Sequence, residues 1–148
     1  MGGAGISSHI FGLLCDYVEE VEVVLANSSI VRTSRNENQD LFFAMRGASS
    51  SYGIATNFAI RTEPAPPSTV SYSYAWTASD AASRAQVFKN WQKLLSSGTL
   101  PREISYALVA TPTSMVVSGV YFGSEAEFAS LNLSSYFSTA PQIASIKV

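Results

Sequence analysis

The sequence predicts an α+β protein made of two consecutive pieces. Short runs that alternate apolar and polar residues indicate strands in both halves, and amphipathic segments between them indicate helices. The proline-rich segment 64–67 separates the two halves. We therefore expect one domain over residues 1–65 and a second domain over residues 68–148.

The first half begins with a glycine-rich loop and then predicts a hairpin, a helix and a strand. Residues 18–34 hold two β-branched runs around a turn sequence, which is typical of a β-hairpin. Residues 36–47 predict a short helix capped by Asn36 or Asn38. Residues 53–63 alternate as a strand does, after the small-residue segment GASSSYG. The predicted core face of the helix consists of Leu41, Phe42 and Met45.

The second half predicts the order β-α-β-β-α-β, the ferredoxin-like split βαβ pattern. Such an arrangement places an antiparallel sheet against helices on one face and leaves the other face free. The aromatic residues Tyr72, Tyr74, Trp76 and Tyr106 are therefore candidates for a binding face as well as for the core. The expected strands are residues 69–76, 103–111, 114–123 and 142–148, and the expected helices are residues 79–98 and 124–140.

Three capping signals define the helices of the second half. Ser79 is the expected N-cap of the first helix, and Gly98 is its expected C-cap. Ser124 followed by Glu127 predicts a capping box at the start of the second helix.

Composition argues against several classes of function. The chain has 148 residues, of which 47% are hydrophobic, and its net charge is −2. Lys and Arg form no cluster, so we expect no nucleic-acid partner. No apolar run approaches the roughly 20 residues that span a bilayer, so we expect no membrane association. One cysteine and one histidine exclude an internal disulfide and a zinc site.

The few reactive side chains suggest no catalytic machinery of their own. Cys15 lies in an apolar segment and is expected to be a buried, inert thiol. A pair of Cys15 and His9 lacks an evident third group to orient it. A hydrolase centred on Ser8 and His9 would need a nearby carboxylate, and the sequence has no G-x-S-x-G motif.

Two loops, GGAGISS and GASSSYG, are rich in residues without bulk. Such backbone suits close approach by a flat or anionic ligand. The alternative is that both loops are tight turns and nothing more.

The order of these segments resembles the berberine-bridge-enzyme-like FAD-linked oxidases, and it is closest to the fungal glucooligosaccharide and chitooligosaccharide oxidases. The resemblance covers residues 2–67 strongly, through the segments VVLAN, ENQDLFFAMRG, SSSYGIATNF and PAP. It implies that residues 1–65 are the C-terminal lobe of a PCMH-type FAD-binding domain. It also implies that residues 68–148 are a partial substrate-binding domain.

The resemblance implies an FAD-dependent oxidoreductase. Such an enzyme oxidises a hydroxyl-bearing carbon, here of a sugar or oligosaccharide, with O₂ as the acceptor. By motif alignment, the backbone along FAD would belong to Gly2, Gly3, Gly5, Tyr52, Gly53 and Ile54, and no catalytic or metal-binding residue is carried over.

The family's flavin-linking histidine and its C-terminal tyrosine base cannot be placed in this sequence. We therefore expect an internal or truncated part of such an enzyme, inactive by itself, with an apolar lobe surface that leaves room for self-association. The alternative is an inactive pseudo-enzyme that acts, if at all, as a binding module. Two N-glycosylation sequons, at Asn27 and Asn132, favour a secreted parent protein, although the chain has no signal peptide.

Overall fold

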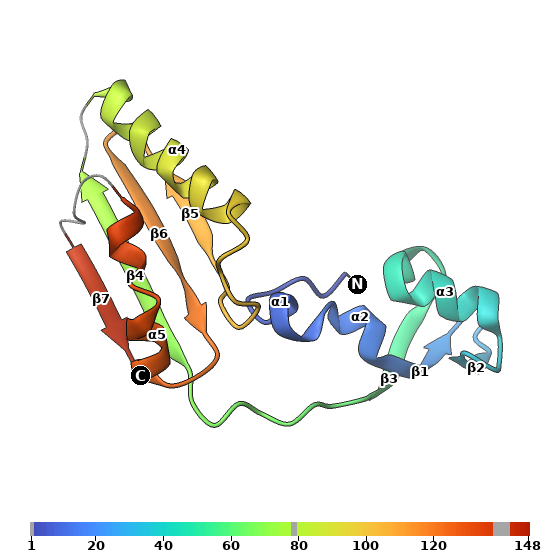
Figure 1. Cartoon of the computed structure of the whole chain (residues 1–148). Helices are drawn as coiled ribbons and strands as arrows, with labels where there is room; N and C mark the ends of the chain where they lie inside the picture. The colour runs from blue at the N-terminus through green and yellow to red at the C-terminus, as the bar shows by residue number, and fades with distance from the viewer. Residues whose placement is uncertain (1, 78–79, 138–142) are drawn as a thin grey trace. The chain divides into compact units, whose positions relative to one another are not determined.

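The computed structural model describes residues 2–77, 80–137 and 143–148. The chain divides into two compact units, Met1–Pro64 and Ala65–Val148, and each is described by itself (Figure 1). The division falls beside the proline-rich segment. Both units combine antiparallel strands with helices, so the predicted α+β class is confirmed.

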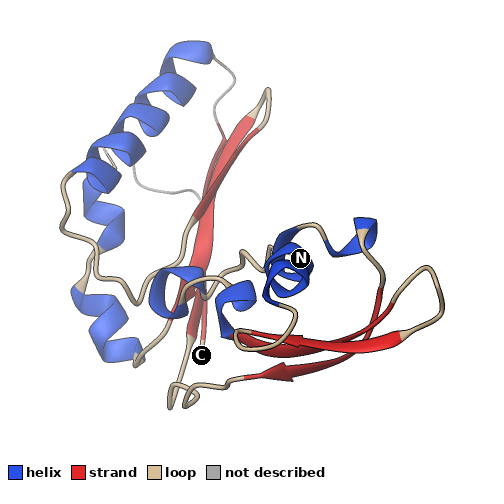
Figure 2. Ribbon diagram, turned by 90° about the vertical axis from the view of Figure 1, so that its right-hand side faces the viewer, coloured by secondary structure: helices blue, strands red, loops and turns tan. Residues whose placement is uncertain are grey.

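The first unit is a three-stranded antiparallel sheet in the order β2-β1-β3, with helices on it (Figure 2). The central strand pairs Val21 with Thr33 on one side and with Phe58 on the other. This pairing confirms the predicted hairpin and strand. The elements are α1 Ser8–Phe11, α2 Leu14–Tyr17, β1 Val18–Val24, β2 Ile30–Ser34, α3 Gln39–Gly47, the 3₁₀ turn η1 Ser49–Ser51, and β3 Ile54–Ile60.

The core of the first unit lies between β1 and α3. Phe42 and Met45 are buried against the strand, and Leu41 packs beside them as its position on the helix predicts. Asn38 is the N-cap residue, but its side chain does not cap the helix. Its Nδ2 instead donates a hydrogen bond of 2.7 Å to the Arg32 carbonyl, which ties the start of α3 to β2.

The second unit is a four-stranded antiparallel sheet in the order β5-β6-β4-β7, with its helices on one face (Figure 2). This is the strand order that the split βαβ pattern requires, so the β-α-β-β-α-β prediction is confirmed. The elements are β4 Val70–Thr77, α4 Ala81–Ser96, β5 Ala107–Ala110, β6 Ser114–Tyr121, α5 Glu125–Ser130, the 3₁₀ turn η2 Leu133–Tyr136, and β7 Ile143–Lys147.

The aromatic face of β4 points toward the helices. The Tyr72 ring lies 5.1 Å from that of Phe128, and the Trp76 ring lies 4.4 Å from that of Phe137, between ring centroids. Tyr72, Tyr74 and Trp76 are buried, and Tyr106 packs edge-on against Trp91. The idea that these aromatic residues form a binding face is therefore wrong, because the helices cover them.

The other face of the second sheet carries short side chains on β4 and β6, with Lys147 of β7 opposite Ser71 at its edge, and we call it the helix-free face. Its members alternate with the buried aromatic residues along β4 and pair across to β6 in register. They are Ser71, Ser73 and Ala75 on β4, opposite Val120, Ser118 and Val116 on β6.

The helix ends differ from the predictions in two places. The expected helix over residues 124–140 is interrupted, because Asn132 adopts a left-handed conformation with φ of 44° after α5 ends. Asp80 caps α4 by accepting from the Ser83 amide at 2.8 Å, and the predicted cap Ser79 lies outside the described residues. The capping box of Ser124 and Glu127 is confirmed. The C-cap of α4 is Ser97 and not the predicted Gly98, which follows it with a positive φ of 69°.

Candidate cofactor-binding loops of the first unit

The glycine-rich loop before α1 is held against α2. Gly3 has a φ of 76°, and a Cβ at this position would lie 2.5 Å from the Cβ of Leu14. The Leu14 amide donates to the Gly3 carbonyl at 3.2 Å, which closes the contact. Only glycine fits here, because a side chain would be strained by the backbone and would collide with the helix.

Gly2 and Gly5 occupy a different environment in the same loop. No described heavy atom lies within 4 Å of the position that a Cβ would take at either residue. The Ser8 hydroxyl accepts a hydrogen bond of 2.9 Å from the Gly5 amide, so this side chain contacts the backbone of the loop. The loop therefore keeps open space on its outer side, which a flat ligand could fill.

The second candidate loop follows α3. The Tyr52 and Gly53 amides donate to the Ser49 carbonyl at 3.1 and 3.3 Å, which forms a compact turn. The Tyr52 and Ile54 side chains are 52% and 70% exposed. Both residues are thus accessible to a ligand, as the predicted role requires.

Packing against β1 requires a glycine at position 53. A Cβ on Gly53 would lie 2.6 Å from the Val23 side chain and 2.7 Å from the Val24 carbonyl oxygen. The close approach that the sequence suggested is therefore, at this glycine, an approach to β1.

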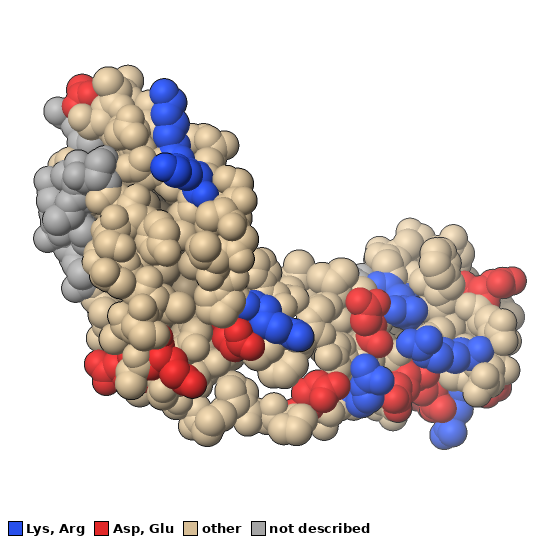
Figure 3. All heavy atoms as spheres, in the orientation of Figure 1, with Lys and Arg blue, Asp and Glu red and all other residues tan. Residues whose placement is uncertain are grey.

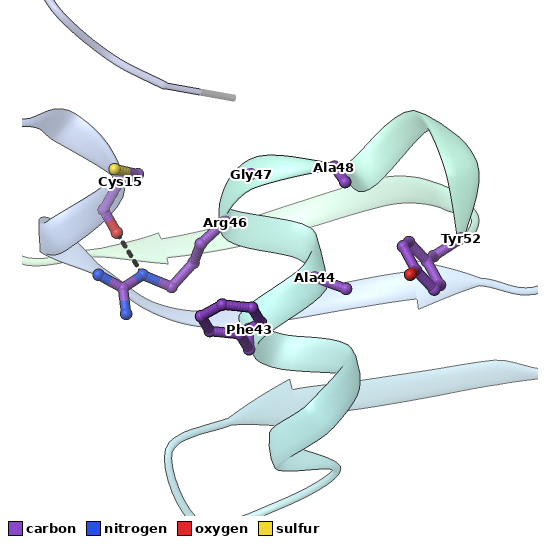
Figure 4. Close-up of a pocket in the computed structure, with 7 residues that line it drawn as sticks. All are labelled: Cys15, Phe43, Ala44, Arg46, Gly47, Ala48 and Tyr52. Carbon is purple, nitrogen blue, oxygen red and sulfur yellow. Dashed lines mark hydrogen bonds between the residues drawn. The ribbon is translucent and has the colours of Figure 1, made fainter.

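A cavity of about 400 Å³ lies beside this loop (Figure 4). The aromatic rings of Phe43 and Tyr52 come from α3 and from the loop after it, and Phe43 is 80% exposed. Small residues form much of the remaining wall. The complete lining is Cys15, Phe43, Ala44, Arg46, Gly47, Ala48 and Tyr52.

A smaller cavity of about 90 Å³ borders the glycine-rich loop. It is lined by Gly3, Leu14, Cys15, Val18, Phe58 and Ile60. Cys15 thus faces both cavities and is only partly buried. The expectation of a buried thiol is wrong because α2 has only four residues and lies over open space on two sides.

Arg46 joins α3 to α2, and its place in the last turn of α3 was the only feature of this residue that the sequence indicated. Its Nε donates to the Cys15 carbonyl at 2.7 Å (Figure 4). Its Nη2 lies 2.6 Å from Asp16 Oδ1. Both partners belong to α2.

Charged residues give no other candidate site among the described residues. Acidic and basic side chains are interspersed over the visible face of the first unit (Figure 3). No group of three or more His, Cys, Asp or Glu side chains in the described ranges could hold a metal ion. No described helix is long and apolar enough to cross a bilayer.

Comparison with known proteins places the chain among relatives that are linked to FAD. Homologues of this chain are FAD-linked oxidoreductases and carbohydrate oxidases, so the resemblance seen in the sequence is confirmed. Its structural neighbours are berberine-bridge-enzyme-like (BBE-like) proteins and oligosaccharide oxidases. No protein-family model matches the chain.

Individual relatives match nearly all of this chain. "FAD-linked oxidoreductase sorD" of Penicillium rubens is 60% identical over 147 residues, which is 99% of this chain and 31% of the relative. A wild-type BBE-like 1 structure of Physcomitrella patens is 32% identical with a TM-score of 0.82, over 98% of this chain and 32% of that one. A xylooligosaccharide oxidase of Myceliophthora thermophila, solved with xylobiose, is 30% identical with a TM-score of 0.84, over 99% of this chain and 31% of that one. The chain thus spans about a third of the length of these proteins.

Proposed function

We propose that the protein to which this chain corresponds is an FAD-dependent oxidoreductase. Its substrate would be a sugar or oligosaccharide that is oxidised at a hydroxyl-bearing carbon, with O₂ as the acceptor. The names of the homologues support both the cofactor and the substrate class. The bound flavin would supply the redox chemistry, and the chain would supply walls around it.

The observation that carries the proposal is the open, backbone-rich surface of the two loops. The space outside Gly2 and Gly5 and the exposure of Tyr52 and Ile54 fit a flat cofactor laid along the chain. Gly3 and Gly53 would hold the loops in shape from behind. No residue of this chain is proposed as a catalytic acid or base.

The second unit would form part of the substrate-binding domain. Since its aromatic face is covered by α4, α5 and η2, the helix-free face is the surface left for the rest of the protein or for substrate. Its short side chains allow a close approach by another layer of structure.

A segment exchange tests the proposal directly. We would replace the matching segment of the Myceliophthora xylooligosaccharide oxidase with this 148-residue sequence and purify the chimera. We expect it to keep bound flavin, seen as yellow colour and visible absorbance, and to release peroxide with at least one sugar from a panel of oligosaccharides. A folded chimera without flavin would contradict the cofactor assignment, and one with flavin but inactive on every sugar would contradict the substrate class.

We propose that the isolated chain is inactive as an enzyme. The second candidate function is that of a binding module. Its large exposed apolar side chains include Phe43, Ile54 and Ile6, which are 80%, 70% and 63% exposed. We expect the purified chain to make no flavin-dependent peroxide and to associate with itself in light-scattering measurements. Peroxide production by the chain alone would refute this.

We also propose that the parent protein is secreted. Both sequon asparagines are exposed, and Asn27 lies in the β1–β2 turn, where its Oδ1 accepts from the Ser29 amide and hydroxyl at 3.0 and 2.7 Å. Expression through a eukaryotic secretory pathway should give glycan at Asn27, detected as a mass shift that peptide N-glycosidase removes. Asn27→Gln should abolish that part of the shift, and an unmodified Asn27 would count against secretion.

A further inference from the structure

Arg46 fastens α2, and α2 carries the glycine-rich loop. The last carbonyl groups of a helix have no partner within the helix, and α2 ends at Tyr17, only two residues beyond Cys15. The Arg46 Nε supplies the missing donor for the Cys15 carbonyl. The same guanidinium group reaches the Asp16 carboxylate, so both contacts use one rigid fork of donors.

The glycine-rich loop rests on the residue just before this pair. Leu14 donates its amide to the Gly3 carbonyl, and its side chain fills the space that a Cβ on Gly3 would need. Any displacement of α2 would therefore move Gly3. The contacts run from Arg46 through α2 to the loop.

The second candidate loop starts from the same arginine. Arg46 lies in the last turn of α3, and the turn that leads to Tyr52 and Gly53 begins two residues later, at Ala48. The Arg46 side chain thus sets the position of the glycine-rich loop through α2, and Arg46 itself lies two residues before the second loop begins. The guanidinium group is partly shielded, with 26% of the side chain exposed, so water competes less for it than for a free surface arginine.

We propose that Arg46, paired with Asp16, is a positioning residue that holds the two cofactor-binding loops at a fixed spacing. The inference rests on the proposed function for its meaning, because only a ligand that spans both loops would need that spacing. The arginine itself does not contact the ligand in this proposal. Its role is to make the surface of the two loops rigid before FAD binds. This improves the affinity for FAD, because less conformational entropy of the loops is lost on binding.

The test uses the 148-residue chain with Arg46→Ala and Arg46→Lys, and Arg32→Ala as the matched control. Arg32 belongs to an exposed pair with Glu20 at 3.8 Å on the β1–β2 hairpin, so it shares the chemistry but contacts neither loop. Amide hydrogen exchange by NMR would compare Leu14 with the β1 amide of Val21. FAD affinity would be followed by quenching of flavin fluorescence.

Arg46→Ala should speed exchange at Leu14 by about tenfold and leave Val21 within about twofold of the original chain. Lysine should restore little of the protection, because it lacks the two-pronged geometry. Methylguanidinium at millimolar concentration should restore protection in Arg46→Ala, since it can occupy the vacated space and remake both hydrogen bonds. The affinity for FAD should fall in Arg46→Ala together with the protection of the Leu14 amide, and it should return when methylguanidinium restores that protection.

Unchanged exchange at Leu14 in Arg46→Ala would overturn the proposal. Equal acceleration at Leu14 and Val21 would also overturn it, because the arginine would then be stabilising the whole unit. If the original chain binds no FAD, the cofactor assignment fails for the isolated chain, while the exchange data still decide whether Arg46 holds the loop.

Discussion

The hydroxyl of Tyr72 donates a hydrogen bond of 2.9 Å to the backbone carbonyl of Ser105 in the core of the second unit. Ser105 is itself fixed to β6, because its hydroxyl donates to the Val120 carbonyl at 3.0 Å and accepts from the Val120 amide at 2.9 Å. The contact thus joins the central strand β4 to the segment that leads into β5. It passes beside Gly119, where a Cβ would lie 2.0 Å from the Ser105 oxygen.

Tyr72→Phe should lower the free energy of unfolding by about 1 kcal/mol, because it removes this buried hydrogen bond and leaves the ring in place. Urea denaturation followed by tryptophan fluorescence would measure the change, since Trp76 and Trp91 both lie in this core. Tyr136→Phe is the control, because Tyr136 is 43% exposed and should tolerate the change. Equal effects of the two substitutions would show that the Tyr72 bond is not the cause.

Buried tyrosines should make the second unit sensitive to alkaline pH. Burial raises the pKa of Tyr72, Tyr74 and Tyr121 above the ordinary value of 10.0. The neighbouring tyrosines Tyr74 and Tyr106 raise the pKa of Tyr72 further, and the carboxylates of Glu127 and Glu103 raise that of Tyr121 further. The folded state then keeps protons that the unfolded state loses. Stability that is complete below pH 10 should therefore fall as the pH rises beyond it. Circular dichroism would follow unfolding, and ultraviolet absorbance would follow the formation of tyrosinate. The tyrosinate signal of the buried tyrosines should appear together with the loss of the circular dichroism signal.

Ionisation of all seven tyrosines near pH 10 in the intact fold would contradict this expectation. Tyr72→Phe offers the matched comparison, since it removes one of the raised groups and should make the alkaline loss of stability less steep.

The capping box of α5 should weaken in acid. Hydrogen bonds from Ser124 lower the pKa of the Glu127 carboxyl below its ordinary value of 4.5. The contribution to stability is present above pH 4.5 and is lost as the pH falls through the lower pKa of the folded state. Ser124→Ala should destabilise the protein by about 1 kcal/mol at neutral pH and should reduce this acid dependence, because only the backbone amide at position 124 would still donate to Glu127. Thermal melts at several pH values would measure both effects, with Glu125→Gln as the control.

Gly53 and Gly47 form a matched pair of glycines around the second loop. Gly53→Ala should cost about 3 kcal/mol, because the new methyl group would collide with Val23 and with the Val24 carbonyl. Gly47→Ala meets no described atom within 4 Å and lies inside α3, so it should be neutral or slightly stabilising. Urea denaturation would separate the two. A similar cost for both would mean that loop flexibility, rather than contact with β1, explains the glycine.

Sequence patterns were sufficient where a local rule decides the structure. The capping box needs only Ser124 and Glu127 at the right spacing, and β4 needs only its strict alternation. The strand order of the second sheet followed from the order of the elements alone. These features depend on neighbours in the chain, which a sequence displays directly.

Patterns failed where the outcome depends on distant partners. Alternation places Tyr72 and Trp76 on one face of β4, but only the docking of Phe128 and Phe137 determines that this face is covered. The pairing of Arg46 with α2 joins residues 30 and 31 positions apart, and no local rule indicates it. Asn132 interrupts a segment whose periodicity suits a single helix, because it takes a left-handed conformation there.

The helix-free face of the second sheet has a consequence for the thermodynamics of assembly. Ser71, Ser73 and Ala75 have few or no rotamers to lose when another surface covers them. A face of lysine or glutamate side chains would lose far more freedom at the same step. Covering the β4 part of this face therefore starts with a small entropic cost, whereas Lys147 at the β7 edge would lose more freedom if it were covered.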